Sequence, residues 1–281
     1  MKLHVIHSGN FKLDGGAMFG VIPKVIWNSL NPADEKNLCN WAMRCLLVED
    51  GDRRILIDTG IGDKQSEKFF GYYYLNGKYS LTSSLNNAGF NSDDITDVLL
   101  THLHFDHVGG AVMKTEAGLL KPTFPNATYH VTEKQWNHAM NPNDREKASF
   151  LPENFLPLQE AGVLNFVEQG EMLTPNIRIR SVNGHTMGMI TPEISCYGKK
   201  IIYCADLIPS SAHVPVHYSM GYDIEPLVVM QEKKQLYTEM DAGNTLYFFE
   251  HDVDAECARL ESNERGLMVI AEKGNLAAML G

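Results

Sequence analysis

The stretch Thr101-His102-Leu103-His104-Phe105-Asp106-His107-Val108-Gly109-Gly110 determines how the rest of this chain is interpreted. It follows the apolar residues 98–100, which predict a buried strand that ends where the polar residues begin. Alternation along extended backbone places His102 and His104 on one side, whereas Asp106 and His107 follow where the glycines predict a turn. Imidazole and carboxylate groups are ligands for zinc, iron or manganese, so this spacing favours a metal site over a surface cluster of histidines.

The pattern His-x-His-x-Asp-His after an apolar strand resembles that of the metallo-β-lactamase superfamily. The resemblance implies three further ligands, namely a histidine, an aspartate that bridges two metals and a final histidine, each at the end of its own strand. The candidates are His185, Asp206 and His251, which follow the runs 177–182, 201–205 and 246–250. Because all of them occur in the family's order, the match extends from residue 102 to residue 251.

The resemblance also implies a role for each ligand. The first metal is expected on His102, His104 and His185, the second on Asp106, His107 and His251, with Asp206 as the bridge. The expected cofactors are two divalent transition-metal ions, with zinc first and manganese, iron or cobalt as alternatives. Such a pair lowers the pKa of a shared water and so supplies a hydroxide nucleophile. Asp106 is also the candidate to pass a proton to the leaving group, and Asp58 is expected to orient the ligands through hydrogen bonds.

The implied architecture is an α+β fold, a four-layer αββα sandwich whose two mixed sheets pack face to face with the dinuclear site at one edge. The chain of 281 residues, 44% of them hydrophobic, is long enough for one large core, and a single domain over 1–281 is expected. The residue patterns agree with alternating strands and helices. Strands are predicted at 3–7 (with Gly9 as the stop), 45–48, 54–57, 128–131, 177–182 and 266–270, and helices at 80–87, from 132 onward, at 156–160 and at 225–240.

Composition limits the partners and the compartment. Lys and Arg total 24 against 35 Asp and Glu, a net charge of −11, which argues against nucleic acid as a partner. The five cysteines lack Cys-x-x-Cys spacing and are expected to be reduced. The N-terminal residues lack a long apolar signal region, and no apolar run of roughly 18 residues could span a membrane. A cytoplasmic monomer or homodimer that acts on a small molecule, without a membrane partner, is therefore expected.

Two segments are candidates for substrate contact. In the glycine-rich loop 14–20, Met18 and Phe19 could contact an acyl or aromatic group, although both would serve equally well as core anchors. The irregular run 207–224 follows the proposed bridging aspartate, and loops at such strand ends select substrates. His213 is the candidate polar residue of this pocket, with an exposed loop histidine as the alternative.

Within the superfamily, the chain is most similar to the N-acyl homoserine lactonase and methyl parathion hydrolase group, through its Asp14-Gly15-Gly16 loop and the Ala205-Asp206-Leu207 context. Two other branches fit less well, because class B β-lactamases commonly have cysteine in place of Asp206 and flavodiiron proteins have glutamate in place of His104. Neither pattern is present in this chain. Glyoxalase II carries a helical segment after its last ligand that this chain lacks the length to form. One departure concerns the tyrosine that the best-known lactonases have three residues after the bridging aspartate. Here that residue is Pro209, and Tyr218 or Tyr222 could replace the tyrosine.

The expected activity is therefore hydrolysis of an ester-like bond, first by a quorum-quenching lactonase of the N-acyl homoserine lactone type and second by a phosphotriesterase or arylesterase. Few cationic residues occur near the predicted pocket, which favours uncharged substrates. A mononuclear iron oxygenase of the persulfide type is the alternative from another class. Such an oxygenase would bind one iron and would leave Asp106, His107 and His251 without a metal to bind. A third alternative, a binding protein without activity, is disfavoured because it would not need so complete a set of ligands.

Overall fold

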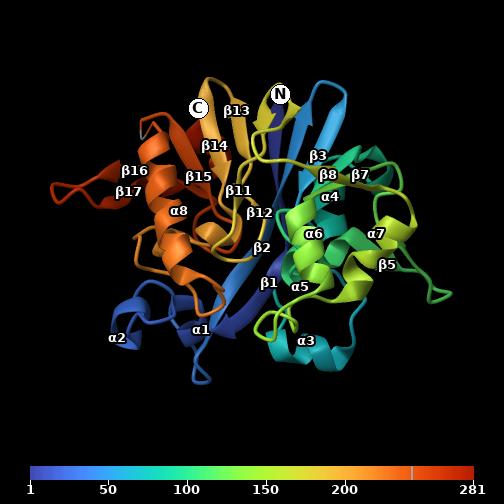
Figure 1. Ribbon diagram of the computed structural model, residues 1–281, viewed down its shortest axis with the longest axis horizontal. Coiled ribbons are helices and arrows are strands. Elements are labelled where there is room, and N and C mark those ends of the chain that lie inside the picture. Colours follow the sequence, from blue (N-terminus) through green and yellow to red (C-terminus); the bar gives the residue numbers. More distant parts are fainter. Residues whose placement is uncertain (242) are drawn as a thin grey trace.

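Two stacked β-sheets form the centre of the computed structural model, which describes residues 1–241 and 243–281 (Figure 1). In sheet order, the first sheet contains β1 (Lys2–Asp14), β2 (Leu38–Asp50), β3 (Arg53–Ile57), β4 (Asp97–Leu99), β7 (Thr128–Thr132) and β8 (Leu164–Val167). The second contains β17 (Met268–Gly274), β16 (Cys257–Ser262), β15 (Thr245–Phe248), β14 (Lys199–Tyr203), β13 (Glu193–Cys196), β10 (Ile177–Arg178) and β9 (Met172–Thr174). Both sheets are mixed, since β3, β4, β7 and β8 run parallel, as do β14 and β15.

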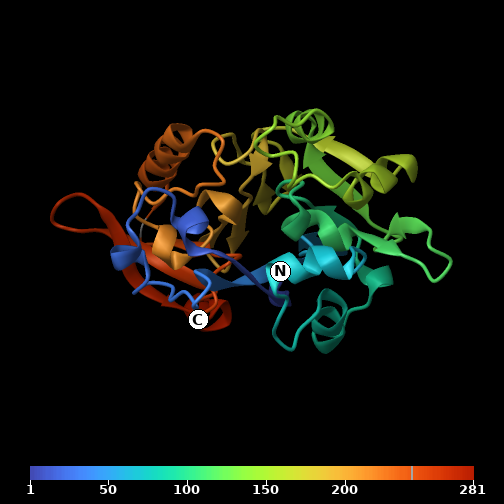
Figure 2. The ribbon, with the colours of Figure 1, turned by 90° about the horizontal axis from the view of Figure 1, so that it is seen from below.

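Helices cover the outer faces of both sheets, so the expected αββα sandwich is confirmed (Figure 2). On the first sheet lie α4 (Leu81–Asn87), α6 (Glu133–Met140) and α7 (Leu156–Glu160), which share one buried cluster with its strands. On the second lies α8 (Pro226–Glu239), whose buried residues include Val229 and Leu236. Shorter elements are α1 (Gly15–Phe19), α2 (Lys24–Trp27), α3 (Glu67–Tyr73), α5 (Phe105–Val108), α9 (Leu276–Leu280) and the hairpins β5 (Val112–Lys114) with β6 (Leu120–Pro122) and β11 (Ser181–Val182) with β12 (Met189–Ile190).

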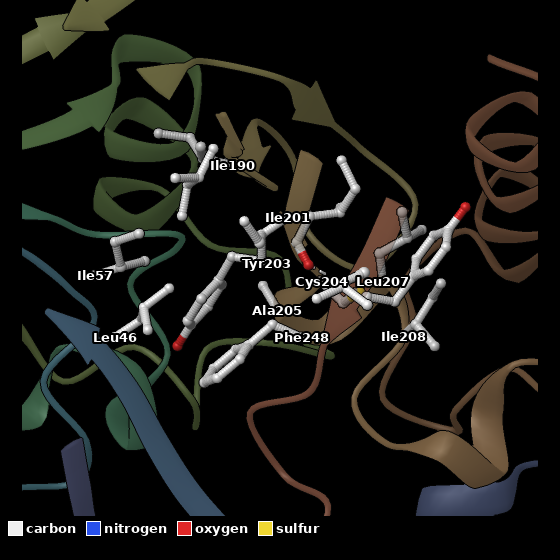
Figure 3. Close-up of a cluster of buried hydrophobic side chains, with 14 of the residues drawn as sticks. Leu46, Ile57, Ile190, Ile201, Tyr203, Cys204, Ala205, Leu207, Ile208 and Phe248 are labelled. Carbon is white, nitrogen blue, oxygen red and sulfur yellow. Dashed lines mark hydrogen bonds between the residues drawn. The ribbon is translucent and has the colours of Figure 1, made fainter. Parts of the chain in front are cut away.

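Side-chain alternation in the first sheet explains the layers. Along β2, Leu46 and Val48 join the cluster shared with the second sheet, whereas Cys45 and Leu47 join the cluster under the outer helices. Figure 3 shows Leu46 and Ile57 directed toward Tyr203 of β14. The Tyr203 hydroxyl donates to the carbonyl of Arg44 at 2.9 Å, so this buried polar group is satisfied across the two sheets.

The first sheet also holds the chain that leaves the second. Beyond the end of β15, the carbonyls of Glu250 and His251 accept hydrogen bonds from the backbone amides of Arg44 and Ala42 in β2, both at 3.1 Å. The Arg44 guanidinium, itself buried, donates to the carbonyls of Phe249 and Asp252 at 2.7 Å each. These bonds hold the chain beyond β15 against β2, at the edge of the sandwich where the candidate ligands lie.

Several predicted strands differ from the structure in extent. The strand predicted at 45–48 is part of the longer β2, and the one predicted at 266–270 begins at Met268 and continues to Gly274 as β17. Gly9 does not end the first strand, because β1 continues to Asp14 through an irregularity between His7 and Asn10. Gly9 has φ of +121°, a conformation that L side chains rarely adopt, so glycine permits the bulge. The run 177–182 is divided, since Ile177–Arg178 pairs within the second sheet while Ser181–Val182 pairs with β12. The helices predicted at 80–87, 156–160 and 225–240 were confirmed as α4, α7 and α8.

The loop expected at residues 14–20 contains the short helix α1. Asp14 caps it, because its side chain accepts a hydrogen bond from the backbone amide of Ala17 at 2.9 Å. Within the described residues, no helix has the length and apolar character needed to cross a membrane.

Candidate metal centre

The motif after β4 supplies ligand-type side chains in two directions. His102 and His104 follow the strand directly, and His104 is the residue before α5. This single turn of helix carries Asp106 and His107, and the amide of His107 donates to the carbonyl of His104 at 3.1 Å. All four side chains are buried. A change from strand to helix within six residues is therefore what separates the two pairs.

The remaining candidates arrive from other elements and complete two groups. His185 follows β11, Asp206 lies in a 3₁₀ turn (Ala205–Leu207) after β14, and His251 follows β15. Within each group, one ligand atom per residue lies within 4.8 Å of the others. The first group is His102, His104, His185 and Asp206, and the second is Asp106, His107 and His251.

Asp206 lies between the two groups and faces both. Its Oδ2 atom is 3.1 Å from Nε2 of His185, while its Oδ1 atom is 3.1 Å from Nε2 of His251. The preceding residue, Ala205, has φ of +45°, which is unusual for a residue with a side chain. This turn directs the carboxylate between the histidines, the placement required of a ligand shared by two cations.

Each of the five candidate histidines has one ring nitrogen held by a partner outside its group. The pairs are His102 Nδ1 with Thr101 Oγ1 (3.0 Å), His104 Nε2 with Glu146 Oε1 (3.3 Å), His107 Nδ1 with Asp58 Oδ2 (3.1 Å), His185 Nδ1 with Asp223 Oδ1 (2.9 Å) and His251 Nδ1 with the Ala42 carbonyl (2.7 Å). A neutral imidazole that donates through one nitrogen presents a lone pair at the other. The partners thus determine which nitrogen faces inward.

The inward atoms are arranged as a cation site requires. His104 Nδ1 lies 3.2 Å from His185 Nε2, and His107 Nε2 lies 3.3 Å from His251 Nε2. Among the described residues, the buried atoms His102 Nε2 and Asp206 Oδ1 have no hydrogen-bond partner. Facing lone pairs and unpaired buried polar atoms are unfavourable unless something binds them, so the donor set fits two metal ions.

Electrostatics favour a neutral His102 and an ionised Asp206. Burial lowers the pKa of His102 well below its ordinary value, and the neighbouring His107 and His104 lower it further, so its imidazole is neutral. Burial raises the pKa of Asp206, but His185, His107 and His251 oppose this and hold it well below the usual range. Neutral imidazole and ionised carboxylate are the forms that bind metal ions. Burial lowers the pKa of His185, but Asp206 and Asp223 raise it to about 10, so this ring must lose a proton before it can bind a metal ion.

Two buried carboxylates lie behind His107. Asp58 accepts hydrogen bonds from the backbone amide of Thr101 at 2.7 Å and from its hydroxyl at 2.6 Å, and its Oδ2 atom also contacts His107. Glu250 Oε2 lies 3.1 Å from the same Nδ1 atom of His107. Burial raises the pKa of Glu250 to about 8. The sequence pointed to Asp58 but not to Glu250, although Glu250 is a charged residue directly after the apolar run 246–249.

A cavity of about 380 Å³ opens onto the two groups. His104, Asp106, His185, Asp206 and His251 form its floor. Most side chains of its wall are apolar or aromatic, namely Leu13, Met18, Tyr73, Phe105, Met220 and Tyr222, and the segment with Glu146, Ala148 and Ser149 also lines it. Arg145 also lines it, and within the described chain its guanidinium contacts the carbonyl of Gly221.

Comparison with known proteins identifies the family. A model of the Metallo-beta-lactamase superfamily matches residues 44–265, well over half of the chain. The chain belongs to this superfamily. The N-acyl homoserine lactonase AiiA of Bacillus thuringiensis subsp. kurstaki is 23% identical over 270 residues, which cover 91% of this chain and 94% of AiiA.

Solved structures share the fold of this chain. A probable metal-dependent hydrolase from Staphylococcus aureus is 28% identical with a TM-score of 0.86, over 96% of this chain and 97% of its own. AidC, a dizinc quorum-quenching lactonase solved with a homoserine product, is 22% identical with a TM-score of 0.78, over 97% and 96%. The protein is a metallo-hydrolase of the metallo-β-lactamase superfamily, related at low identity to N-acyl homoserine lactonases.

For a hydrolase of this superfamily, the substrate pocket is less evident from sequence than the ligands are. Met18 lines the cavity, as expected. Phe19, expected beside it, is fully buried and stacks on the His213 ring at 4.7 Å. His213, expected as a polar pocket residue, is itself fully buried, with Nε2 2.8 Å from the Met18 carbonyl and Nδ1 2.8 Å from Ser210 Oγ. Both side chains anchor the loops behind the cavity because their polar and aromatic contacts are made within the core.

The two candidate tyrosines are also separated by the structure. Tyr218 is buried beside Phe19, at 6.4 Å between ring centroids, whereas Tyr222 lines the cavity. Burial, together with the neighbouring Tyr73 and Asp106, raises the pKa of Tyr222, so its hydroxyl stays protonated and can donate. Tyr73 comes from α3, a segment without any functional signal in the sequence, and its ring packs on Phe105 at 4.6 Å.

Proposed function

We propose that this metallo-hydrolase opens the ring of a small lactone, with N-acyl homoserine lactones as the first substrate class. The observation that carries the proposal is the cavity, which combines a floor of candidate metal ligands with a mostly apolar wall. Leu13, Met18 and Met220 offer a surface for an acyl chain. The lactonases related to this chain by sequence, such as AiiA, support the same class.

We further propose that the cofactors are two zinc ions, the first on His102, His104 and His185 and the second on Asp106, His107 and His251, with Asp206 as the bridge. When bound, such ions activate water and polarise the electrophilic oxygen of the substrate. The two groups of inward-facing nitrogen and oxygen atoms support two sites. A mononuclear iron oxygenase would give the second group no role.

The side chains of the cavity supply orientation and proton transfer in this proposal. The protonated hydroxyl of Tyr222 donates a hydrogen bond to an oxygen of the substrate. Tyr222 would thus substitute for the tyrosine that the best-known lactonases have at the position of Pro209. Asp106 lines the cavity with its carboxylate, where it can take up the proton lost by the attacking water and pass it to the leaving alkoxide. The apolar wall excludes water from the rest of the substrate.

Arg145 narrows the substrate class further. The sequence predicted few cationic residues near the pocket, but the guanidinium of Arg145 lines the cavity, where it donates to the carbonyl of Gly221. Arg145 therefore favours a lactone that carries a second hydrogen-bond acceptor, such as an amide carbonyl. A simple γ-lactone lacks this group.

A substrate panel tests the proposal. Zinc-loaded protein is expected to cleave N-acyl homoserine lactones with kcat/KM well above that for simple γ-lactones, aryl esters and phosphotriesters, because kcat/KM reports differential binding of the transition state. Arg145→Ala should reduce the advantage of the acylated lactone over the simple one. If a phosphotriester or aryl ester is cleaved and no lactone is, the lactonase proposal fails and the phosphotriesterase alternative replaces it.

Metal content tests the cofactor proposal separately. Protein purified without chelator is expected to hold about two metal ions per chain, and Asp206→Ala should lower the occupancy of both sites. His4→Ala is the matched control, because His4 contacts Glu49 at 2.8 Å on another part of the first sheet. A reproducible content near one ion, or equal loss in the two variants, would contradict the ligand assignment.

A further inference from the structure

Glu146 is a buried carboxylate in the segment that follows α6, and it contacts a candidate ligand from behind. Its side chain is almost fully buried, and its Oε1 atom lies 3.3 Å from Nε2 of His104. The other oxygen, Oε2, is 2.6 Å from Nε2 of His138 and accepts from the side-chain amide of Asn143 at 2.8 Å. A carboxylate removed from water in this way keeps its position only because these partners satisfy it.

This contact determines how the His104 ring is used. A neutral imidazole carries one N–H, and an ionised carboxylate can only accept. With Nε2 donating to Glu146, the lone pair of His104 is on Nδ1, which faces His185 Nε2 at 3.2 Å. If the proton moved to Nδ1, the atom facing the site would be a donor and could not bind a cation.

The surrounding segment holds the ring as well as its carboxylate. The carbonyl of Ser149 accepts a hydrogen bond from the amide of Phe105 at 3.0 Å, which ties the segment to the start of α5. The Phe150 ring lies 4.9 Å from the His104 ring. Phe150 and Glu146 therefore both restrict the orientation of the His104 ring, and Glu146 also lines the cavity.

We propose that Glu146 is a positioning residue for the first metal, because it selects the Nδ1-binding form of His104 and fixes the orientation of the ring. The inference rests on the metal site of the proposed function but not on the substrate. Glu146 acts through His104 and is not itself a ligand. Asp223 holds His185 in the same way, at 2.9 Å from its Nδ1 atom, so two of the three histidines in the first group have a carboxylate behind them.

The test compares zinc affinities of the two sites by chelator competition in the full-length chain. Glu146→Ala is expected to weaken one of the two zinc ions about 10- to 100-fold, the usual cost of losing such a partner, and to leave the other nearly unchanged. Glu146→Gln retains an oxygen that can accept from His104, so it should recover much of that loss. A second readout is the visible spectrum of the cobalt-substituted protein, in which only the bands of the first site should shift.

Asp97→Asn is the matched control. Asp97 is also a buried carboxylate that accepts from a histidine, His130, at 2.8 Å, but it lies at the other end of β4 from the ligands. The Asp97→Asn variant should unfold more easily and bind both zinc ions as the unmodified protein does. If Glu146→Ala has unchanged affinity at both sites, or weakens both equally while Glu146→Gln recovers nothing, the proposal is wrong.

The outcomes also separate this inference from the proposed function. If Glu146→Ala does not fold, Glu146→Leu takes its place, because leucine fills a similar volume but cannot accept from His104. An unshifted cobalt spectrum together with unchanged affinities in Glu146→Leu would then overturn the inference. If the unmodified chain binds no metal, the cofactor proposal itself fails. If it binds two ions but cleaves no lactone, only the substrate assignment fails, and the role of Glu146 is still tested by the affinities.

Discussion

Gly184 lies where the loop carrying His185 meets the first turn of α8, and adding a single methyl group there should disturb the metal centre. A Cβ atom at this position would lie 2.4 Å from the backbone nitrogen of Val229 and 2.6 Å from its Cγ2 atom. The loop cannot easily move, because the carbonyls of Gly184 and His185 accept from the amides of Glu225 and Ile224 at 2.9 and 3.2 Å. Gly184→Ala is therefore expected to push His185 away from its group.

The geometry sets the size of the effect. Ordinary contacts of a Cβ atom begin near 3.4 Å, so the loop and α8 must separate by about 1 Å. Overpacking of this kind costs about 1–3 kcal/mol of the free energy of unfolding. For a chain of this size, a cost of about 2 kcal/mol lowers Tm by roughly 4–8 °C. A displacement of about 1 Å at a reacting centre can lower kcat/KM by roughly 100-fold.

Thermal unfolding, zinc content and kcat/KM for the best lactone substrate would be measured on Gly184→Ala and on Gly274→Ala. Gly274 is a fair control, because nothing lies within 4 Å of the place that its added methyl group would occupy and its φ is not in the left-handed region. Two variants with the same Tm, zinc content and kcat/KM would refute the reasoning that close packing against α8 positions His185.

Two further predictions follow from the cavity and from the first sheet. Tyr222→Phe should lower kcat/KM about 10- to 100-fold without loss of zinc, because it removes one hydrogen-bond donor from the cavity. Tyr218→Phe, the control, should leave kcat/KM unchanged. Equal activities of the two variants would exclude Tyr222 as the donor. Burial raises the pKa of Asp97, but hydrogen bonds from His130, Arg53 and Thr96 lower it more, to well below its usual range. Ionised Asp97 therefore stabilises the fold at pH values above the pKa of this carboxyl in the unfolded chain, about 4. This stabilisation is lost as the pH falls through the lower pKa of the folded state. Asp97→Asn should cost roughly 3 kcal/mol at pH 7 and flatten the loss of stability below pH 4, as measured by urea unfolding; a parallel pH dependence would contradict this.

Local sequence was sufficient for the motif because its residues are neighbours in the chain. An apolar run that gives way to His102, His104, Asp106 and His107 predicts a strand end with ligands, and the structure forms β4 and α5 there. The helical periodicity of residues 225–240 likewise predicted α8, since its buried face repeats every three to four residues. In both cases the information lies within one or two turns of chain.

The partners of these residues could not be predicted in this way. Glu146 is 42 positions from His104 and Asp223 is 38 from His185, and no periodicity marks either one. Tyr73 lies in a segment without any functional signal, and Arg145 differs from other exposed arginines only in its position at the cavity. Such contacts depend on which loops the sheets bring together.

The candidate ligand residues and the alternation of strands and helices could be predicted from the sequence, because side-chain chemistry and periodicity are properties of short segments. The order of the ligands and the αββα sandwich were implied by the resemblance to the superfamily. Only the tertiary structure decided which nitrogen of each histidine faces inward and which group each oxygen of Asp206 faces. It also decided which of Met18, Phe19 and His213 reach the cavity. The reason is the pairing of β2 with the chain beyond β15, which joins residues about 200 positions apart at one edge of the sandwich. Hydrogen bonds across that edge, and close packing behind it, select one arrangement from the many that the same residues could form.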